Sequence, residues 1–173
     1  MMSIRWYALR VKPHKEQFVC QQLQAQSVQF YYPSVRVKPV NPRSATVRPF
    51  FPGYLFVQLD IEQEGVDAYR WLPGVHGLVM FGGVPAVVHE SLIAEIRGRL
   101  QKIEAVGGLT AETFQPGDRV RIVSGPLAGY EAIFDARLPG KERVQVLLAF
   151  LSAQPKPVKL DAQHVRKVDG EAG

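Results

Sequence analysis

The chain has 173 residues, 46% of them apolar, and a formal net charge of +5, which is the composition of an ordered globular protein. No apolar run approaches the roughly 18–20 residues that span a bilayer, and the N-terminus lacks the apolar core of a signal peptide. A single cysteine, Cys20, excludes an intramolecular disulfide and fits a reducing compartment. We therefore expect a cytoplasmic protein that does not contact the membrane. With one Cys and four scattered His, we expect no metal site.

Charge is distributed unevenly along the chain. Residues 1–48 carry eight Lys and Arg against one acid, Glu16, for a net charge of +7. Residues 49–104 carry four Lys and Arg against seven acids, for a net charge of −3. A face that binds a polyanion would explain this asymmetry, and a basic surface loop without any ligand would explain it equally well.

Residues 1–106 predict strands and helices in alternation. Residues 4–11 (IRWYALRV) are aromatic and β-branched and predict a strand. Pro13 is expected to open a helix, with Phe18, Val19 and Leu23 as its apolar stripe. The same criteria predict a strand over 30–37 interrupted by Pro33, an exposed basic loop or hairpin tip over 38–49, a strand over 54–59, a short helix over 65–72, a strand over 78–81 and a helix over 91–105.

A glycine pair at the start of residues 107–110 (GGLT) is the best candidate for a domain boundary. The last 60 or so residues carry turn signals every 8–12 positions, which is typical of a small β-barrel. The predicted fold class is α+β: an α/β sandwich with an antiparallel sheet flanked by helices, followed by an SH3-like barrel. The predicted division is a first domain over 1–106, a flexible linker over 107–113, a barrel over 114–168 and a tail over 169–173.

The barrel segment contains a recognisable motif. Its sequence PGDRVRIVSGPLAGYEA resembles the KOW motif of ribosomal and transcription proteins. Gly117, Gly125 and Gly129 would be its structural residues, placed where a tight barrel needs positive φ or close backbone approach.

Motifs ahead of that barrel resemble those of one protein family. The chain contains, in this order, the segments WYALRVKPHKE, FFPGYLFVQLD, LPGVHGLVMFGG and PAVV, an amphipathic helix and a KOW unit. This ordered set closely resembles the NusG family of transcription elongation factors. The resemblance covers about residues 4–168. It implies an NGN domain that binds the clamp helices of the largest RNA polymerase subunit, followed by a KOW domain.

The resemblance places polymerase binding on an exposed aromatic patch. The patch would contain Phe51, Pro52 and Tyr54, with Trp6 and Tyr7 on a neighbouring strand. Strand alternation favours Phe51 and Tyr54 as exposed, with Leu55 and Val57 pointing inward, and leaves open which of Trp6 and Tyr7 is exposed. The simpler interpretation is that these aromatic side chains belong to the core.

The family's nucleic-acid contact maps onto a cationic segment at the first strand-to-helix junction. In the family this edge faces upstream DNA and the non-template strand, so the side chains of the segment would neutralise phosphates. Arg70 would join them, and Trp71 could stack on a single strand, although a Trp in this context is more often buried. A solvated helix start is the alternative. The segment's residues are Arg10, Lys12, His14 and Lys15.

The KOW domain of the family recruits Rho or a small-subunit ribosomal protein, and here Phe150 and Leu151 would form that contact. Residues 144–154 are ambiguous, because their apolar side chains fit both a strand and a helix. Barrel strands are the default expectation. The LLAFL run also resembles RfaH-like paralogues of the family, whose KOW domain can fold as an α-hairpin that masks the polymerase site.

No catalytic constellation is present, so we expect no enzymatic activity and no cofactor. The predicted function is that of a monomeric elongation or antitermination factor that suppresses pausing. The alternative is a KOW-type ribosomal or RNA-binding protein that does not contact polymerase. Whether the factor acts generally or at a dedicated DNA element stays open.

Overall fold

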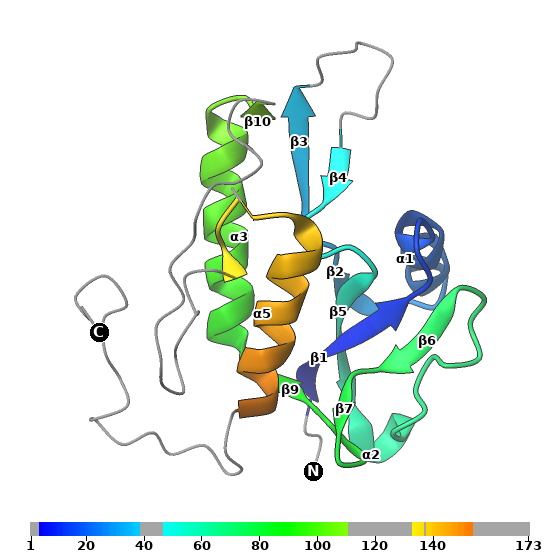
Figure 1. Cartoon of the computed structure of the whole chain (residues 1–173). Coiled ribbons are helices and arrows are strands. Elements are labelled where there is room, and N and C mark those ends of the chain that lie inside the picture. Colours follow the sequence, from blue (N-terminus) through cyan, green and yellow to red (C-terminus); the bar gives the residue numbers. More distant parts are fainter. Residues whose placement is uncertain (1–3, 39–46, 111–132, 137, 154–173) are drawn as a thin grey trace.

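A computed structural model describes residues 4–38, 47–110, 133–136 and 138–153 of the chain (Figure 1). An antiparallel sheet lies at its centre and helices cover both faces. The strands are β1 (Ile4–Val11), β2 (Gln29–Tyr31), β3 (Ser34–Lys38), β4 (Val47–Pro49), β5 (Tyr54–Asp60), β6 (Val75–Leu78), β7 (Met80–Phe81), β8 (Val84–Pro85), β9 (Val87–Val88) and β10 (Leu109–Thr110). The helices are α1 (Glu16–Ala25), α2 (Ile61–Glu64), α3 (Glu90–Ala105) and α5 (Gly140–Ala153).

The main sheet has the strand order β2-β5-β1-β6, and β9 also pairs with β1. Every pairing within it is antiparallel, with Ala8 of β1 opposite Phe56 of β5. A second sheet consists of the β3–β4 hairpin, to which β10 adds in parallel. The short β7–β8 ribbon is separate from both.

Side chains of the main sheet alternate between two apolar clusters, as the two-residue period of a strand requires. Tyr7 and Leu9 of β1 enter a cluster beneath α1, which also holds Val19 and Leu23 of that helix. Ala8, between them in β1, points to the opposite face. On β5, Leu55, Val57 and Leu59 pack beneath α1, while Phe56 faces the other cluster.

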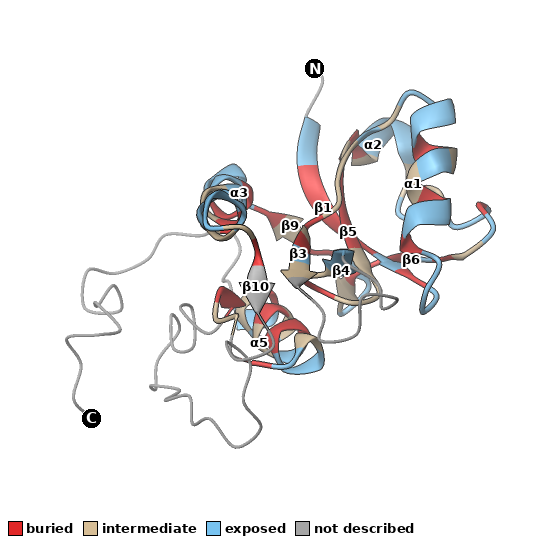
Figure 2. Ribbon diagram, turned by 90° about the horizontal axis from the view of Figure 1, so that it is seen from above, coloured by how far each residue is buried: buried red, intermediate tan, exposed pale blue. Residues whose placement is uncertain are grey.

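The other cluster is covered by α3 and α5. Figure 2 shows these helices on one side of the sheet and α1 on the other. Ile93 and Ile96 of α3 and Leu147 of α5 are almost fully buried in this cluster. A helix from near the C-terminal end of the chain therefore completes the core of a domain built from the first hundred residues.

The fold class is confirmed as α+β with an antiparallel sheet. The predicted strands over 4–11 and 54–59 and the predicted helix over 91–105 match β1, β5 and α3. The hairpin suggested around 38–49 is confirmed by the β3–β4 pairing, and its tip lies outside the described residues.

Four predicted elements differ in their bounds or type. The strand predicted over 78–81 is divided between β6, which ends at Leu78, and β7 (Met80–Phe81). The first helix begins at Glu16, after a turn in which His14 has φ of +65°, so Pro13 does not open it. The predicted strand over 30–37 is divided into β2 and β3 at Pro33, which cannot donate a ladder hydrogen bond. The helix predicted over 65–72 is wrong: the chain turns there, because Gly65 (φ +84°) ends α2 and Tyr69 (φ +61°) leaves the helical region.

The C-terminal half gives the largest departure. Residues 140–153 form α5, so in this conformation the default expectation of barrel strands over 144–154 is wrong for 144–153, where the helical alternative applies; residue 154 lies outside the described residues. These residues form a helix rather than a strand because the helix packs a continuous apolar stripe on an apolar face of the sheet domain. Gly117, Gly125 and Gly129 of the KOW motif lie outside the described residues, so the barrel prediction is untested.

The predicted linker begins with defined structure. The backbone N–H groups of Gly107 and Gly108 donate to Glu104 and Ile103 carbonyls of α3, each at 2.9 Å. Leu109–Thr110 then pairs with β3 as β10. These contacts hold residues 107–110 against the first domain.

None of the helices in the part of the chain described is long and apolar enough to cross a membrane.

A matched pair of substitutions tests the burial pattern. Val57→Ala removes two methyl groups from a fully buried site and should lower the free energy of unfolding by roughly 2 kcal/mol. Val66→Ala makes the same chemical change at a side chain that is 44% exposed and should change it by less than about 0.5 kcal/mol. Urea unfolding measures both, and equal effects would contradict the assignment of the core.

Candidate functional site

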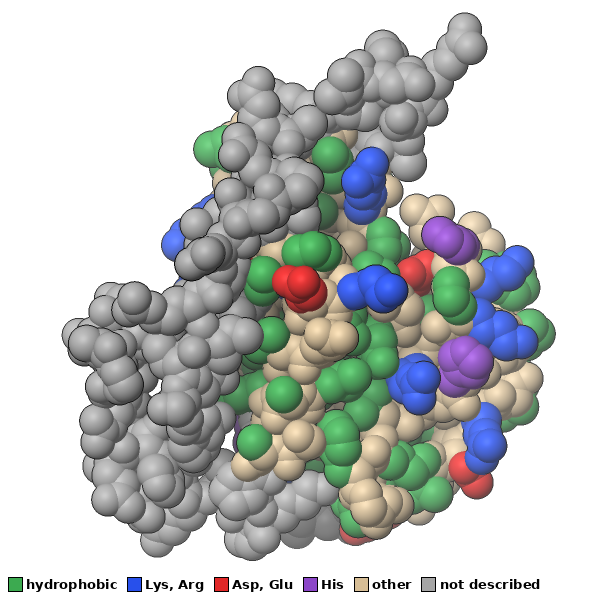
Figure 3. All heavy atoms as spheres, in the orientation of Figure 1, with side chains coloured by type: hydrophobic (Ala, Val, Ile, Leu, Met, Phe, Trp, Pro, Cys, Tyr) green, Lys and Arg blue, Asp and Glu red, His purple; other side chains and the backbone are tan. Residues whose placement is uncertain are grey.

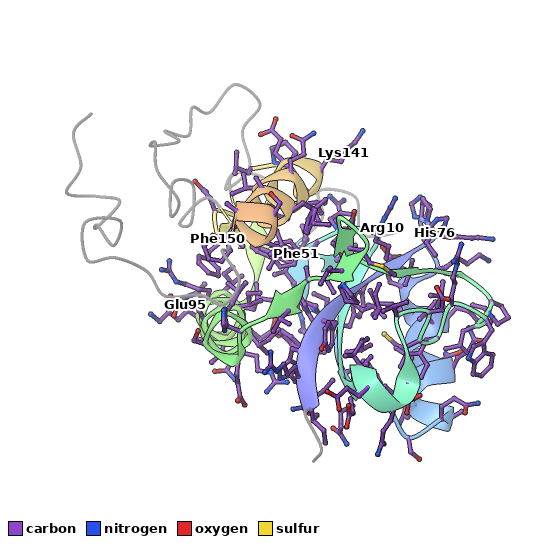
Figure 4. The ribbon with its side chains drawn as sticks, turned by 90° about the horizontal axis from the view of Figure 1, so that it is seen from below. Arg10, Phe51, His76, Glu95, Lys141 and Phe150 are labelled. Carbon is purple, nitrogen blue, oxygen red and sulfur yellow. The ribbon has the colours of Figure 1, made fainter. Side chains whose placement is uncertain are left out.

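The turn that precedes β5 lies directly beneath α5. It contains Phe50, Phe51 and Pro52, and both Phe side chains are fully buried. Their rings meet edge to face, with centroids 5.1 Å apart, and Phe51 makes a similar contact with Phe56 at 6.1 Å. Figure 4 shows Phe51 between the sheet and α5. Phe51 was expected to be exposed, and this is wrong in the present conformation because α5 covers it.

α5 meets this turn with an apolar stripe. Val144, Leu147 and Leu151 are buried, at the i, i+3 and i+7 spacing that puts side chains on one helix face. The first residue of the helix, Gly140, approaches Pro52 so closely that an added Cβ would lie 2.7 Å from its Cγ and Cδ. A side chain at position 140 therefore requires the helix or the turn to move.

Arg143 adds a polar attachment within the apolar contact. Its side chain is buried, and its Nε donates a hydrogen bond to the Phe50 carbonyl at 3.0 Å. Its Nη1 donates to the carbonyls of Leu138 and Asp135 in the segment leading into α5. The guanidinium also lies 4.0 Å from the centroid of the Phe50 ring. Burial lowers the pKa of Arg143 to about 10, which leaves it charged at neutral pH.

The structure separates the two aromatic residues of β1. Trp6 belongs to the cluster that contains Phe51, whereas Tyr7 points to the opposite face, beneath α1. Tyr7 is therefore not part of the surface around Phe51. Tyr54 is half-buried against the Phe51 cluster, and the inward orientation of Leu55 and Val57 is confirmed.

Phe150 and Leu151 lie within the contact between α5 and the sheet domain. Leu151 is 3% exposed, and Phe150 is partly buried against the cluster that also contains α3 (Figure 4). In this conformation both residues face the sheet domain, so their predicted role in partner binding would require α5 to move away.

Glu16 connects the turn to the start of α1. It is buried, and its Oε2 accepts a hydrogen bond from the Gly53 N–H at 2.9 Å. The Val11 N–H donates to the Gly53 carbonyl at 2.8 Å. The turn that carries Phe51 is thus tied to the end of β1 and to the first residue of α1.

A cationic surface lies around the end of β1 and the start of α1. Its predicted members Arg10, Lys12, His14, Lys15 and Arg70 are all exposed. Figure 3 shows Lys, Arg and His side chains gathered over the end of β1, the start of α1 and the neighbouring β6. The structure adds a further exposed residue to this group, His76 of β6, which Figure 4 places on the same side as Arg10.

Sequence reasoning missed three residues that contact the covered turn: Arg143, Gly140 and Glu16. A signal was present for the first, because Arg143 stands four residues before Leu147 on the apolar stripe of the helix, where a charge is unexpected. The contacts of Gly140 and Glu16 join residues that are far apart in the sequence, and no local pattern indicates them.

Nothing in the described residues resembles a catalytic or metal centre. Across 4–38, 47–110 and the described part of 133–153, no three His, Cys, Asp or Glu residues are grouped so that they could hold a metal ion. Burial, with a smaller contribution from Glu16, raises the pKa of Cys20 to about 11. The thiol is therefore protonated at neutral pH and is a poor nucleophile.

Comparison with known proteins identifies the family. The sequence model described as transcription termination factor nusG matches residues 4–97. The transcription termination/antitermination protein NusG of Thermus thermophilus is 31% identical over 186 residues, which cover 96% of this chain and 100% of the relative. The protein of the same name from Escherichia coli K12 is 30% identical over 128 residues, covering 72% of this chain and 68% of the relative. A solved structure, "Domain interaction in Thermotoga maritima NusG", shares 21% identity at a TM-score of 0.41 over 72% of this chain and 75% of that chain, and the family assignment does not depend on it.

The match to the family's sequence model spans more than half of the chain, and the Thermus relative aligns along nearly all of it. The relatives are transcription factors, which confirms the expectation of a non-enzymatic protein. The chain belongs to the NusG family of transcription termination/antitermination proteins.

Proposed function

We propose that this protein is an elongation and antitermination factor whose NGN domain binds the clamp helices of the largest RNA polymerase subunit. The contact surface would consist of Phe51, Pro52 and Tyr54, with Trp6 beside them. One observation carries the proposal: the fully buried Phe50 and Phe51 are covered by a helix that comes from the other end of the chain.

The shape of this surface favours a helical partner. It already accommodates α5, whose apolar stripe packs on it in the way an amphipathic helix packs into a groove. A partner helix with apolar side chains at the same spacing would bury the same aromatic rings. Aromatic anchors of this kind each contribute a few kcal/mol when desolvated at an interface.

We further propose that α5 masks the site in the free protein, so polymerase binding requires α5 to leave. The two contacts are mutually exclusive, because both would use Phe51. The partner must therefore bind the open form strongly enough to shift the population away from the closed one. Once released, residues 144–150 have the alternation of apolar side chains that a barrel strand needs.

The cationic surface would contact nearby upstream or non-template DNA through phosphates, which supplies affinity with little sequence information. Held on the clamp and on the DNA together, the factor would keep the polymerase cleft closed and disfavour pausing. The released KOW domain would be a second arm for Rho or a small-subunit ribosomal protein, in a protein that acts as a monomer in the cytoplasm.

Tyr54 offers the cleanest test of the polymerase surface. Tyr54→Ala should weaken binding to core polymerase roughly tenfold or more, as expected for an aromatic anchor. Tyr32→Ala is the matched control, because Tyr32 is also half-buried but packs on the α1 side of the sheet. Adding Phe51→Ala should abolish binding, with unfolding curves to show that the domain still folds. Equal affinities for the Tyr54 and Tyr32 variants would contradict the site and favour a factor that binds RNA alone.

Gly140→Ala tests masking. Its new Cβ meets Pro52 at 2.7 Å, so α5 should dock less tightly and affinity for core polymerase should rise. The rise is bounded at roughly five- to a hundredfold by the 1–3 kcal/mol typical of an overpacked contact. Gly98→Ala in α3 is the control, since its Cβ would have no neighbour within 4 Å. Masking is contradicted if both variants bind polymerase like the natural protein.

Isolation of residues 107–173 tests whether α5 depends on the sheet domain. A 14-residue helix is marginal in water without tertiary packing, and the buried stripe of α5 would become exposed. We expect far-UV circular dichroism of this fragment to lose the helical signal that these residues contribute to the full chain. A fragment that keeps the helix would show that α5 forms without its contact to Phe51.

A further inference from the structure

We propose that Phe50 is a cation-binding subsite within the surface that α5 covers, and that the polymerase helix that replaces α5 fills it with an Arg or Lys side chain. The backbone carbonyl of Phe50 would accept a hydrogen bond from this side chain, and the Phe50 ring would face its positive charge. The inference rests on the proposed polymerase contact and deepens it, because it names the chemistry that the partner presents at one position.

In the closed form the subsite holds the guanidinium of Arg143. Its Nε donates to the Phe50 carbonyl at 3.0 Å, and its Cζ lies 4.0 Å from the centroid of the Phe50 ring. Arg143 is only 4% exposed. A charge buried this far is tolerated only where hydrogen bonds and favourable electrostatics replace its hydration. Phe50 supplies both of these to Arg143 from the sheet domain.

The Phe50 carbonyl is held in place independently of α5. Phe50 follows the last residue of β4, and its own N–H donates to the Pro33 carbonyl at 2.9 Å. Three residues later, Gly53 is tied by hydrogen bonds to Val11 and Glu16. All of these partners belong to the sheet domain, so we expect the carbonyl to keep its orientation when α5 leaves.

The other acceptors of Arg143 would leave together with it. Its Nη1 donates to the carbonyls of Asp135 and Leu138, which belong to the segment that leads into α5. Departure of α5 would thus leave the Phe50 carbonyl to water, and a partner helix that covers the same rings would expel that water. A buried carbonyl without a donor costs about as much free energy as a lost hydrogen bond, so the partner gains affinity by bringing a donor.

A carbonyl beside an aromatic face favours a cation over a neutral donor. A hydrogen bond from a charged donor is roughly twice as strong as one from a neutral donor. The quadrupole of the ring also attracts a positive charge placed over its face. A hydroxyl or a side-chain amide could satisfy the carbonyl, but it carries no net charge for the ring to attract.

α5 also indicates where the cation stands on the partner helix. Arg143 is four residues before Leu147 and eight before Leu151, so its side chain lies on the same helix face as the apolar stripe. A partner helix that packs on the same surface should therefore carry Arg or Lys four residues from an apolar side chain of its own stripe. This spacing holds whichever way the partner helix runs.

The test measures the affinity of the full-length protein for core polymerase variants. Each Arg and Lys of the clamp helices is replaced in turn by Met, which keeps an unbranched stem and removes the charge and the donor. One substitution should lower the affinity of the natural protein roughly 5- to 150-fold, the cost of a buried carbonyl left without a donor. This measurement requires no change in the protein itself and so does not depend on how a variant folds.

A double-mutant cycle assigns that cation to Phe50. Phe50→Leu removes the ring and retains the carbonyl, and the four affinities should show a coupling of about 2- to 30-fold, the range of a cation–π contact. Any effect of Phe50→Leu on α5 docking cancels from the cycle, because it is the same with both polymerases. Phe51→Leu is the matched control at an equally buried ring, which meets Phe50 and Phe56 edge to face, and it should show no coupling.

The outcomes distinguish the subsite from the surface around it. If Tyr54→Ala weakens binding but no Arg or Lys substitution does so fivefold, the subsite is overturned and the polymerase surface stands. A cation whose loss weakens binding without coupling to Phe50, or with equal coupling to Phe51, acts elsewhere and also overturns the subsite. If Tyr54→Ala and Tyr32→Ala bind polymerase equally well, the surface and the subsite both fail.

Discussion

The structure depends on how the turn from Phe50 to Gly53 is held. On one side, Gly53 exchanges hydrogen bonds with Val11 and Glu16, which fixes the turn to β1 and α1. On the other side, the Phe50 and Phe51 rings close the apolar cluster shared by α3 and α5. Glu16 can be buried there because its carboxyl oxygen accepts a backbone N–H that would otherwise lack a partner. The same turn thus completes the fold of the first domain and forms the contact with the C-terminal helix.

The contact with α5 combines features that would make it specific without making it permanent. Gly140 and Pro52 meet without space for a side chain, which fixes the position of the helix end. Arg143 is buried against backbone carbonyls, and in the proposed open form much of its lost hydration would return. A buried charge of this kind therefore adds geometric selectivity more than net stability. The remaining attraction is the apolar stripe, which a partner with a similar stripe can replace.

Sequence patterns predicted the sheet domain well where the local signal is strong. β1 and β5 are runs of aromatic and aliphatic residues buried on both faces, and α3 has a single apolar face. Sequence patterns also predicted the cationic surface, because the charged side chains at the end of β1 and before α1 remain exposed. They failed at Phe51 and along α5, because the state of each depends on the other. Residues 144–151 fit both periods, and only the apolar surface supplied by a distant segment selects the helix. Trp71 shows the converse: its type predicts burial, and only the structure reveals that the loop exposes it.

The proposed sites differ in accessibility, and this difference suggests an order of binding. The cationic surface is exposed while α5 is docked, whereas the aromatic surface is covered. A tethered helix competes at the effective concentration that its connecting chain imposes, which a free partner has difficulty exceeding. Binding to nucleic acid first would place the clamp at a comparable effective concentration and make the exchange possible. The masked site would then bind polymerase engaged on DNA more tightly than polymerase free in solution, with the same contacts between Phe51 and the clamp in both cases.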